Sequence, residues 1–224
     1  MRVSAIIAVH NGADRLATAI NSILAQDMLP FEIIVVDDGS TDATPETIRS
    51  YGTAVRPFRQ HKAGLSAAHN LAVRHAEGDV IAFLDHDDLW PPHRLAAMAK
   101  LMQSDDDIDI VAGQVKMAVE DENVHKAHDP SRLAITFRPW SVQSLLIRRG
   151  VFDRVGAFDT QLTYGMDVDW YMRVREAGIR YAFLPEVTLV YRLHGANMTN
   201  DMSATSQGLL GAFKNAIARR RQST

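Results

Sequence analysis

Three aspartates stand close together directly after an apolar run of the sequence. Asp85, Asp87 and Asp88 follow residues 80–84, a short run of the kind that forms a buried parallel strand. Carboxylates crowded in this way repel one another unless a cation or hydrogen-bond donors neutralise them. Carboxylate oxygens are the ligands of hard divalent cations, which keep open positions for substrate phosphates. The cluster predicts a site for a divalent cation and a phosphorylated ligand; the alternative is a solvated turn with an aspartate helix cap.

A second acidic pair, Asp37 and Asp38, follows the apolar residues 33–36, and residues 39–42 then turn the chain away. Open α/β sheets bind ligands at the carboxyl ends of their strands, which is where both acidic groups are expected to lie. Taken alone, the pair is also compatible with a simple turn, because Asp, Gly and Ser are common turn residues. Two acidic strand ends in one sheet favour the functional interpretation.

Asp167 and Asp169 stand two residues apart near the expected start of a helix. A carboxylate there could act as a general base that accepts the proton of an attacking hydroxyl. Either aspartate could instead simply complement the helix dipole. Further along, Arg192 and His194 follow an expected strand, where they could contact phosphate or complete a metal shell.

The first expected strand ends at Val9 and passes into His10 and Asn11. These two residues lie at the same edge of the predicted sheet, where they could line a base or ribose pocket or merely terminate the strand. Residues 10–13 read His-Asn-Gly-Ala and lack the Gly-x-Gly-x-x-Gly pattern, which disfavours a dinucleotide oxidoreductase.

The elements that would position these residues alternate between strand and helix over the first hundred residues, as they do in parallel sheets. The expected strands there cover 3–9, 33–36, 55–58 and 80–84, and the expected helices cover 16–24, 44–51, 65–75 and 91–102. Later expected elements are strands over 108–119, 144–147, 181–184 and 187–191 and a helix from 164 to 178. The predicted fold class is α/β, with a Rossmann-like, mainly parallel sheet flanked by helices and a mixed C-terminal region.

The composition excludes several classes of function. Hydrophobic residues make up 46% of the 224 residues, which is ordinary for a globular protein, and the net charge of -3 gives no reason to expect a nucleic-acid partner. The chain has no cysteine, which rules out a disulfide framework and a zinc–thiolate site. Residues 1–9 predict a strand and not a signal peptide. No apolar stretch approaches the ~20 residues that span a bilayer, so a cytoplasmic protein is expected, with any membrane contact peripheral and at the inner face.

Residues 203–224 predict a C-terminal amphipathic helix. Its apolar side is formed by Leu209, Leu210, Phe213 and Ile217. This side could pack on the domain, on a second subunit in a homodimer, or on a membrane surface. The basic residues Lys214, Arg219, Arg220 and Arg221 favour a solvated helix end over a membrane anchor.

Taken together, these motifs resemble the family 2 glycosyltransferases, which have the nucleotide-diphospho-sugar transferase (GT-A) fold. The resemblance extends from about residue 3 to residue 199. The motifs that carry it, in the order of the family, are residues 3–11, 35–42, 64–70, 83–90, 152–159 and 191–194. Any one motif is weak, but the combination is highly specific. It implies one GT-A domain over 1–202, with a nucleotide-binding half over 1–102 and an acceptor-binding half over 103–202.

The resemblance also assigns roles to individual residues. Asp38 would recognise the nucleotide base with Asp37 close by, Asp87 would lie near the ribose or the metal, and Asp88 would bind the cation. Asp167 would be the catalytic base. The other donor-binding residues that it implies are Val9, His10, Asn11, Gly64, Asn70, Asp85 and Arg192. The metal ligands that it implies are Asp87, Asp88 and His194.

Three residues depart from the pattern of the family. Met166 stands where a glutamate is common beside the base, so Asp169 remains an alternative to Asp167. His69 stands where the family often has arginine, which puts a phosphate contact there in doubt. His10 replaces a frequent tyrosine at the position that stacks on the base, and an imidazole can still stack.

The reaction that the resemblance implies is an inverting transfer of a sugar from a nucleotide-diphosphate sugar to a hydroxyl acceptor. The acceptor would be a cell-surface polysaccharide, a lipid-linked glycan or a similar molecule, and the cofactor would be Mn²⁺ or Mg²⁺. The polar stretch 121–139, with Trp140 and Trp170, is expected to form a wall on the acceptor side.

Two alternative functions belong to other classes. A catalytically inactive nucleotide-sugar-binding protein is suggested by Met166 and by the lack of an identifiable acceptor. A phosphohydrolase of the haloacid-dehalogenase type has a nucleophile loop that resembles residues 37–40, but the second acidic residue is missing here at its proper spacing.

Overall fold

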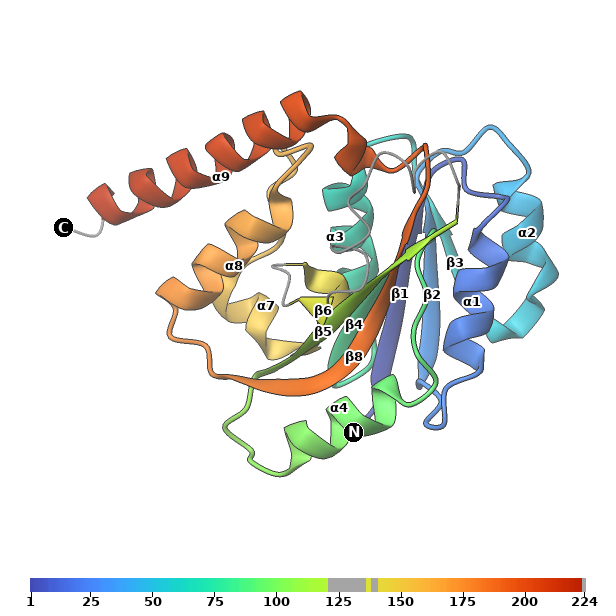
Figure 1. Ribbon diagram of the computed structural model, residues 1–224, viewed down its shortest axis with the longest axis horizontal. Coiled ribbons are helices and arrows are strands. Elements are labelled where there is room, and N and C mark those ends of the chain that lie inside the picture. The colour runs from blue at the N-terminus through green and yellow to red at the C-terminus, as the bar shows by residue number, and fades with distance from the viewer. Residues whose placement is uncertain (121–135, 138–140, 223–224) are drawn as a thin grey trace.

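Among the described residues, eight strands form one sheet at the centre of the fold (Figure 1). The computed structural model describes residues 1–120, 136–137 and 141–222. The strand order is β3-β2-β1-β4-β7-β5-β6, and β8 pairs with β5 outside this path. The strands are β1 (Val3–Val9), β2 (Glu32–Asp37), β3 (Arg56–Arg59), β4 (Val80–Asp85), β5 (Ile110–Val119), β6 (Thr136–Phe137), β7 (Leu145–Arg148) and β8 (Tyr181–Leu193).

Helices cover both faces of the sheet and create two separate cores. Helices α1, α2 and α4 supply side chains to one core, and α3, α7 and α8 supply side chains to the other. The α-helices are α1 (Leu16–Leu24), α2 (Thr44–Ser50), α3 (Leu65–His75), α4 (Arg94–Gln103), α7 (Gly150–Val155), α8 (Met166–Glu176) and α9 (Met202–Gln222). Short 3₁₀ helices are η1 (Gly52–Ala54), η2 (Val142–Ser144) and η3 (Met198–Asn200).

The first four strands pair in parallel, so their carboxyl ends share one edge of the sheet. Strand β7 then runs antiparallel to both β4 and β5, while β8 runs parallel to β5. The predicted α/β fold, with a mainly parallel sheet and a mixed C-terminal region, is confirmed. Both acidic strand ends predicted from the sequence lie at the shared edge.

Strand β4 is buried on both faces, and its alternation decides where the first aspartate of the cluster points. Val80, Ala82 and Leu84 belong to the core beneath α1 and α4, whereas Ile81 and Phe83 belong to the core beneath α3, α7 and α8. Successive side chains of a strand point to opposite faces. Asp85, the last residue of β4, therefore continues the row of Ile81 and Phe83 and faces the side of the sheet that carries α8.

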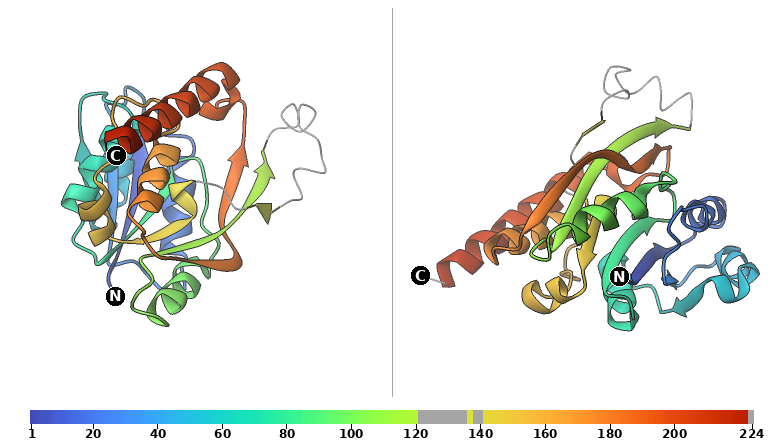
Figure 2. Two further views of the ribbon diagram at one scale, coloured as in Figure 1. Left: turned by 90° about the vertical axis from the view of Figure 1, so that its left-hand side faces the viewer. Right: turned by 90° about the horizontal axis from the view of Figure 1, so that it is seen from below.

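One long strand replaces two that the sequence predicts. Strands over 181–184 and 187–191 are expected, but β8 runs continuously from Tyr181 to Leu193 beside β5 (Figure 2). Its register shifts where Phe183 pairs with Ala112 and Val187 pairs with Gln114. Pro185 lies between these pairs, and proline has no N–H for the ladder, so the chain bulges there without ending the strand.

The C-terminal helix forms as predicted, but a different face of it packs on the domain. Ala212 and Ala216 are 0% and 7% exposed, whereas Leu210, Phe213 and Ile217 are all more than half exposed. The reason is a close approach of two backbones, because a Cβ on Gly208 would lie 2.5 Å from the carbonyl oxygen of Tyr164. Only small side chains fit against a helix held at that distance. Of the three partners that the sequence leaves open for the apolar side, the domain therefore does not cover Leu210, Phe213 and Ile217.

The expected aromatic wall on the acceptor side is also corrected at Trp170. This side chain is 0% exposed, stacks on Phe152 at 5.0 Å and donates a hydrogen bond to the carbonyl oxygen of Gly156 at 3.1 Å. It belongs to the core and is not available to a sugar. Trp140 and residues 121–135 and 138–139 lie outside the described residues. Among the described helices, none is both long enough and apolar enough to cross a membrane.

Candidate functional site

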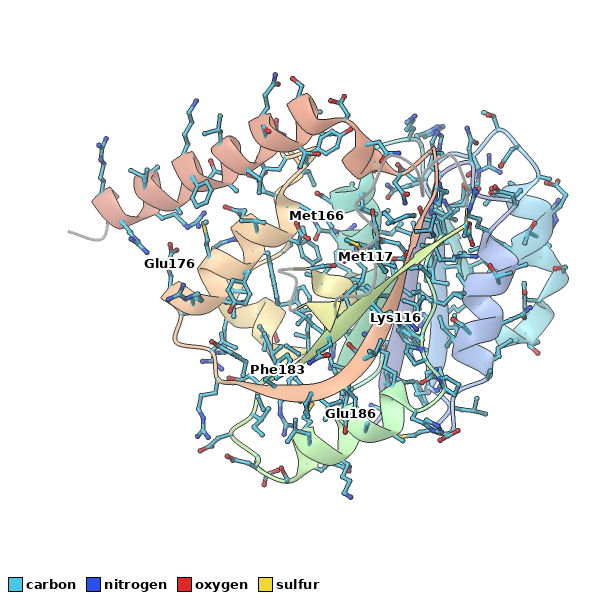
Figure 3. The ribbon with its side chains drawn as sticks, viewed as in Figure 1. Lys116, Met117, Met166, Glu176, Phe183 and Glu186 are labelled. Atoms are coloured by element: carbon cyan, nitrogen blue, oxygen red, sulfur yellow. The ribbon has the colours of Figure 1, made fainter. Side chains whose placement is uncertain are left out.

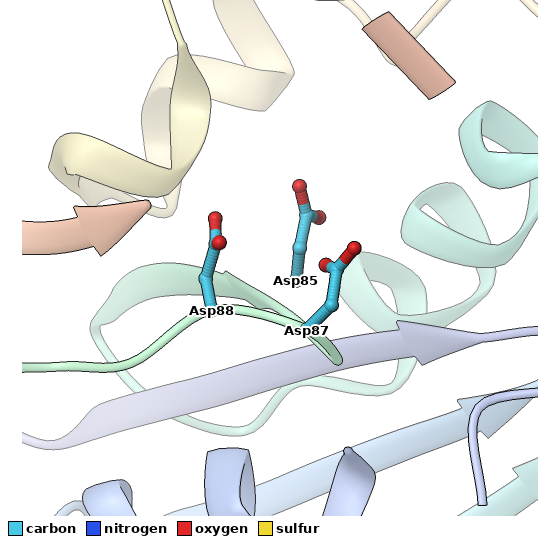
Figure 4. A group of neighbouring side chains, drawn as sticks. All are labelled: Asp85, Asp87 and Asp88. Carbon is cyan, nitrogen blue, oxygen red and sulfur yellow. The ribbon is translucent and has the colours of Figure 1, made fainter. Parts of the chain in front are cut away.

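The three aspartates predicted to bind a cation lie together at the end of β4. Each of Asp85, Asp87 and Asp88 offers one carboxylate oxygen within 4.8 Å of the others, and the three carboxyl groups lie on the same side of the loop (Figure 4). A tight turn brings them together, because the backbone N–H of Asp88 donates to the carbonyl oxygen of Asp85 at 3.1 Å. The turn folds a string of neighbours in the sequence into one acidic group.

Burial and mutual repulsion raise the pKa values of this group. Burial is the larger cause for both Asp85, whose pKa rises to about 7, and Asp88, whose pKa rises to about 9, and the neighbouring carboxylates add to each shift. Oδ1 of Asp85 and Oδ2 of Asp88 are buried without a hydrogen-bond partner among the described residues. Unpaired buried oxygens that resist ionisation fit a bound divalent cation, which would supply the missing positive charge.

The remaining oxygens of the cluster are held by residues from distant parts of the chain. The side-chain amide of Gln143, in η2, donates to Asp85 Oδ2 at 2.7 Å, and the backbone N–H of Arg192, at the end of β8, donates to Asp88 Oδ1 at 2.9 Å. Gln143 was missed in the sequence, because one polar residue in a buried segment gives no local signal of its partner. These contacts leave the unpaired oxygens oriented for a ligand.

His194 and Arg192 lie beside the cluster, as the sequence predicts. His194 Nε2 lies 3.1 Å from Asp87 Oδ2, and the backbone N–H of Ala196 donates to His194 Nδ1 at 3.2 Å. With Nδ1 as the acceptor, Nε2 carries the proton and donates to Asp87. In this arrangement His194 orients a carboxylate of the cluster, and it becomes a metal ligand only if it releases Asp87.

Arg192 brings a positive charge to the acidic edge. Its Nε donates to the carbonyl oxygen of Asp87, its Nη1 donates to Glu120 at 3.0 Å, and its Nη2 is buried without a partner among the described residues. Glu120 also accepts from Arg15 Nε at 3.3 Å. One glutamate thus holds two arginines next to the aspartates, and neither Arg15 nor Glu120 was singled out from the sequence. The unused N–H groups of Arg192 suit the oxygens of a diphosphate.

Asp167 and Asp169 occupy different environments although they are two residues apart. Burial raises the pKa of Asp167 to about 6, and its carboxylate contributes to the raised pKa of Asp85, so the two groups lie close enough to interact. The carboxylate of Asp169, by contrast, is 2% exposed and pairs with Arg173 at 3.1 Å and with Arg219 at 2.8 Å. Asp169 is occupied by two arginines, and Asp167 is the one available to accept a proton.

The pair at the end of β2 is engaged by its own loops. Asp38 accepts hydrogen bonds from the side chain of Gln60 at 2.7 Å and from the backbone N–H groups of Ala63 and Gly64, both at 2.8 Å. Asp37 accepts from the backbone N–H of Ser40 at 2.8 Å. The two carboxylates fix the loops that border the edge between β2 and α3. A hydrogen bond from a nucleotide base to Asp38 would therefore go to a carboxylate oxygen that already accepts hydrogen bonds from these loops.

The turn after β1 lies against the acidic loop. His10 donates through Nδ1 to the carbonyl oxygen of Asp38 at 2.9 Å. The backbone N–H of Asp38 in turn donates to the carbonyl oxygen of Val9 at 2.8 Å. A Cβ on Gly12 would lie 2.2 Å from the His86 ring, so glycine is needed for this approach. Burial lowers the pKa of His86. The β1 turn and the aspartate cluster are thus packed directly on each other.

Asn11 stabilises the neighbouring loop with both its backbone and its side chain. Its backbone N–H donates to Ser40 Oγ at 2.9 Å, and its Oδ1 accepts from the backbone N–H of Thr41 at 2.8 Å. Its φ angle is 52°, in the left-handed region where asparagine is better tolerated than most residues. The predicted contact of Asn11 with a nucleotide remains a prediction.

Helix α3 brings Gly64 to the site, whereas Asn70 and His69 lie deeper. Asn70 forms two hydrogen bonds with the main chain of Phe158, at 2.8 and 2.9 Å, and so fixes the loop before α8. His69 is fully buried against Phe83, and burial lowers its pKa to about 3. His69 is therefore buried in its neutral form and is not exposed to a ligand, and Asn70 serves the site by holding the loop.

Comparison with known proteins gives this arrangement a family. Residues 4–170 match the sequence profile of Glycosyl transferase family 2. The chain belongs to glycosyltransferase family 2. It is 33% identical over 231 residues to an uncharacterized glycosyltransferase of Nostoc, covering 92% of this chain and 68% of that protein. It is 31% identical over 212 residues to one of Rickettsia typhi, covering 88% and 66%.

The fold is shared with solved glycosyltransferases. A mannosyltransferase of Pyrobaculum calidifontis in complex with GDP-Man and Mn²⁺ superposes with a TM-score of 0.74 at 22% identity, covering 97% of this chain and 64% of that one. S. aureus TarS 1-349 in complex with UDP-GlcNAc gives 0.73 at 19% identity, covering 90% and 61%. The predicted family and GT-A fold are confirmed. The chain spans about two thirds of the length of such relatives, 66% of the Rickettsia typhi protein.

Proposed function

We propose that this chain is a metal-dependent, inverting glycosyltransferase that uses a nucleotide-diphosphate sugar as donor and a hydroxyl group as acceptor. One observation carries the proposal: Asp167 lies on the same side of the sheet as an aspartate cluster that has unpaired, buried oxygens. A cation site and a separate base are the two parts that one inverting displacement needs. Membership of family 2 supports the same reaction class.

The donor would bind across the edge formed by β1, β2 and β4. The related structures hold UDP-GlcNAc in one case and GDP-Man with Mn²⁺ in the other, which supports a nucleotide-sugar donor here. The base of the nucleotide would lie near Asp38, His10 and Asn11. Gly64, which has no side chain, would admit the ligand to the start of α3. The diphosphate would meet Arg192, whose Nη2 has no partner among the described residues.

Asp88, Asp87 and Asp85 are the residues that would hold Mn²⁺ or Mg²⁺. When bound, the ion would neutralise the charge that develops on the departing diphosphate. His194 would keep the Asp87 carboxylate in position through its Nε2–H. Gln143 would do the same for Asp85.

Asp167 would take the proton of the acceptor hydroxyl as its oxygen attacks the anomeric carbon. The bond from that carbon to the diphosphate oxygen breaks on the opposite face, and the nucleoside diphosphate leaves with its electron pair. One displacement inverts the configuration and needs one base. A pKa of about 6 leaves Asp167 ionised at neutral pH yet more basic than an ordinary aspartate. The acceptor would be a glycan or a lipid-linked glycan.

The experiment that tests this proposal measures donor binding first and turnover second. Thermal unfolding is recorded with UDP, GDP, dTDP and CDP, each with and without Mn²⁺, for the wild type and for Asp88→Asn. A ligand that binds only the folded state must raise Tm. Asp79→Asn is the matched control, because Asp79 precedes β4 at the opposite edge and pairs with Arg2 at the surface.

We expect one nucleotide to raise Tm in a metal-dependent way, and this would name the donor class. The rise in Tm should be kept in Asp79→Asn and lost in Asp88→Asn. The matching nucleotide sugar is then tested for release of the nucleoside diphosphate. Donor binding without any release would favour the alternative of an inactive binding protein. No rise with any nucleotide would refute the donor site. The phosphohydrolase alternative has lost its support. Asp37 and Asp38 are engaged by loop hydrogen bonds, and the family that matches residues 4–170 is a glycosyltransferase family.

A further inference from the structure

Helix α9 presents three large apolar side chains to solvent on one face. Leu210, Phe213 and Ile217 are 59%, 51% and 53% exposed. Their spacing of three and then four residues places them on the same side of the helix. Exposed aliphatic and aromatic side chains that cluster in this way mark an interaction surface.

The opposite face of α9 is already fully used by the domain. Ala212 and Ala216 are buried, Asn215 donates to Asp159 at 3.1 Å, and Arg219 pairs with Asp169 and with Glu176 at 2.9 Å. Figure 3 shows Glu176 near the end of α8, below α9. The helix is therefore anchored in a defined rotation, and its apolar side chains are held outwards by these contacts.

Within α9, the charged residues that flank the exposed apolar side chains are all positive. Residues 202–222 contain no aspartate or glutamate. Lys214 and Arg221 are exposed, four and eleven residues after Leu210, and so fall on the same side of the helix as the apolar group. We define the outer face of α9 as Leu210, Phe213, Lys214, Ile217 and Arg221.

In place of the solvated helix end that the sequence favours, we propose that the outer face of α9 docks on an anionic lipid surface, because its basic residues lie beside an exposed apolar group. A helix that lies in the membrane interface buries its apolar side chains among the acyl chains and places lysine and arginine against the anionic headgroups. A second copy of this chain fits less well. A two-fold contact would bring the outer face against itself and bury Lys214 and Arg221 in an interface where the face has no acidic residue to pair with them.

Docking at this place would put the lipid surface on one side of α9 and the start of α8 on the other. Figure 1 shows α9 lying along the upper edge of the molecule, above α8. Gly165, just before α8, lies against Gly208 of α9, where an added Cβ would be 3.0 Å from the Gly208 backbone. Asp167 follows two residues later. The docking does not depend on the proposed function, although it would suit a lipid-linked acceptor.

Co-sedimentation of the purified protein with lipid vesicles tests the proposal. Vesicles of phosphatidylcholine alone are compared with vesicles that also contain phosphatidylglycerol, at low and high salt. Two variants alter the outer face, Leu210→Ser/Phe213→Ser/Ile217→Ser and Lys214→Gln/Arg221→Gln. The matched control is Leu29→Ser/Phe31→Ser, since Leu29 and Phe31 are 63% and 50% exposed and lie before β2, away from α9.

Binding to the anionic vesicles, weaker at high salt, is the expected result for the wild type and the control. The apolar variant should bind roughly 10- to 100-fold more weakly, and the charge variant should lose roughly tenfold on anionic vesicles only. All variants should keep the wild-type Tm, because the changed side chains are exposed. Wild-type protein that does not bind anionic vesicles, or an apolar variant that binds as well as the wild type, would overturn the proposal. A dimer in light scattering that the apolar variant loses, without vesicle binding, would assign the face to a second copy.

Discussion

Replacing Asp167 and Asp169 by asparagine is expected to change stability in opposite directions, although they share one turn of α8. Asp167 loses solvation on folding, and its raised pKa shows that the folded state disfavours its charged form. Asp167→Asn removes that unfavourable charge. The Asp169 carboxylate is instead neutralised by Arg173 and Arg219, so Asp169→Asn leaves two arginines without their partner.

The size of the gain at Asp167 follows from its pKa. A rise from 3.8 to about 6 corresponds to roughly 3 kcal/mol, since one pKa unit is about 1.4 kcal/mol. Asp167 is only partly buried, so solvent screening reduces the expected gain to about 1–2 kcal/mol, or ~2–8 °C in Tm for a domain of this size. A carboxyl with a raised folded-state pKa lowers stability as pH rises from about 4 to about 6. Asp167→Asn should therefore be more stable than the wild type above pH 6 and equally stable near pH 4.

The loss at Asp169 is of similar or larger size. Removing one partner from a fully buried ion pair costs about 3–5 kcal/mol. The Asp169 side chain is 2% exposed, but those of Arg173 and Arg219 are 16% and 30% exposed and regain some water. A loss of about 2–3 kcal/mol is expected.

Urea unfolding at about pH 8 and about pH 4 measures both effects, and release of nucleoside diphosphate from the donor measures activity. Asp167→Asn should lose roughly 10²–10⁴-fold in turnover while gaining stability at the higher pH, which is the behaviour of a catalytic group. The reasoning is refuted if Asp167→Asn is less stable than the wild type at about pH 8, or if Asp169→Asn is more stable.

Three further predictions concern the cation, the base and the β1 turn. Asp88→Asn should stabilise the metal-free protein, because it removes a carboxyl whose charged form is disfavoured by burial and then by the neighbouring carboxylates, and it should abolish the Mn²⁺-dependent rise in Tm. Equal Mn²⁺-dependent shifts of Tm in both proteins would contradict the cation site. The kcat/KM for donor turnover should fall tenfold per pH unit below about 6 as Asp167 is protonated, and a profile flat to about pH 5 would exclude it as the base. Gly12→Ala should weaken nucleotide binding in calorimetry, because its Cβ would lie 2.2 Å from the His86 ring, whereas Gly150→Ala meets no atom within 4 Å and should bind normally.

Much of the fold could be predicted from the sequence where burial is periodic. The run 80–84 is buried on both faces, and its short length and the acidic residues after it predicted both β4 and the position of the cluster at the ligand-binding edge. The prediction of β4 also implied that Asp85, Asp87 and Asp88 cluster, because a tight turn after a strand keeps sequence neighbours together.

Features that depend on distant contacts could not be predicted in the same way. Trp170 is an aromatic residue near the site in sequence, yet it is buried in the core by Phe152. The division of 181–193 into two strands failed because the β5 ladder continues past Pro185. The apolar side of α9 does not face the domain, because the backbone of Gly208 lies against Tyr164 and leaves room only for alanines.

The sequence by itself determined most of the strands and helices and which acidic residues meet at the carboxyl edge, since strand alternation and turns are local properties of the chain. The tertiary structure alone separated Asp167 from Asp169, because only the packing of α9 brings Arg219 to one carboxylate and leaves the other beside the aspartate cluster. It also supplied Gln143, whose partner Asp85 is 58 residues away. The chemistry of a carboxylate depends on the charges and donors that surround it, and those neighbours come from parts of the chain that only folding brings together.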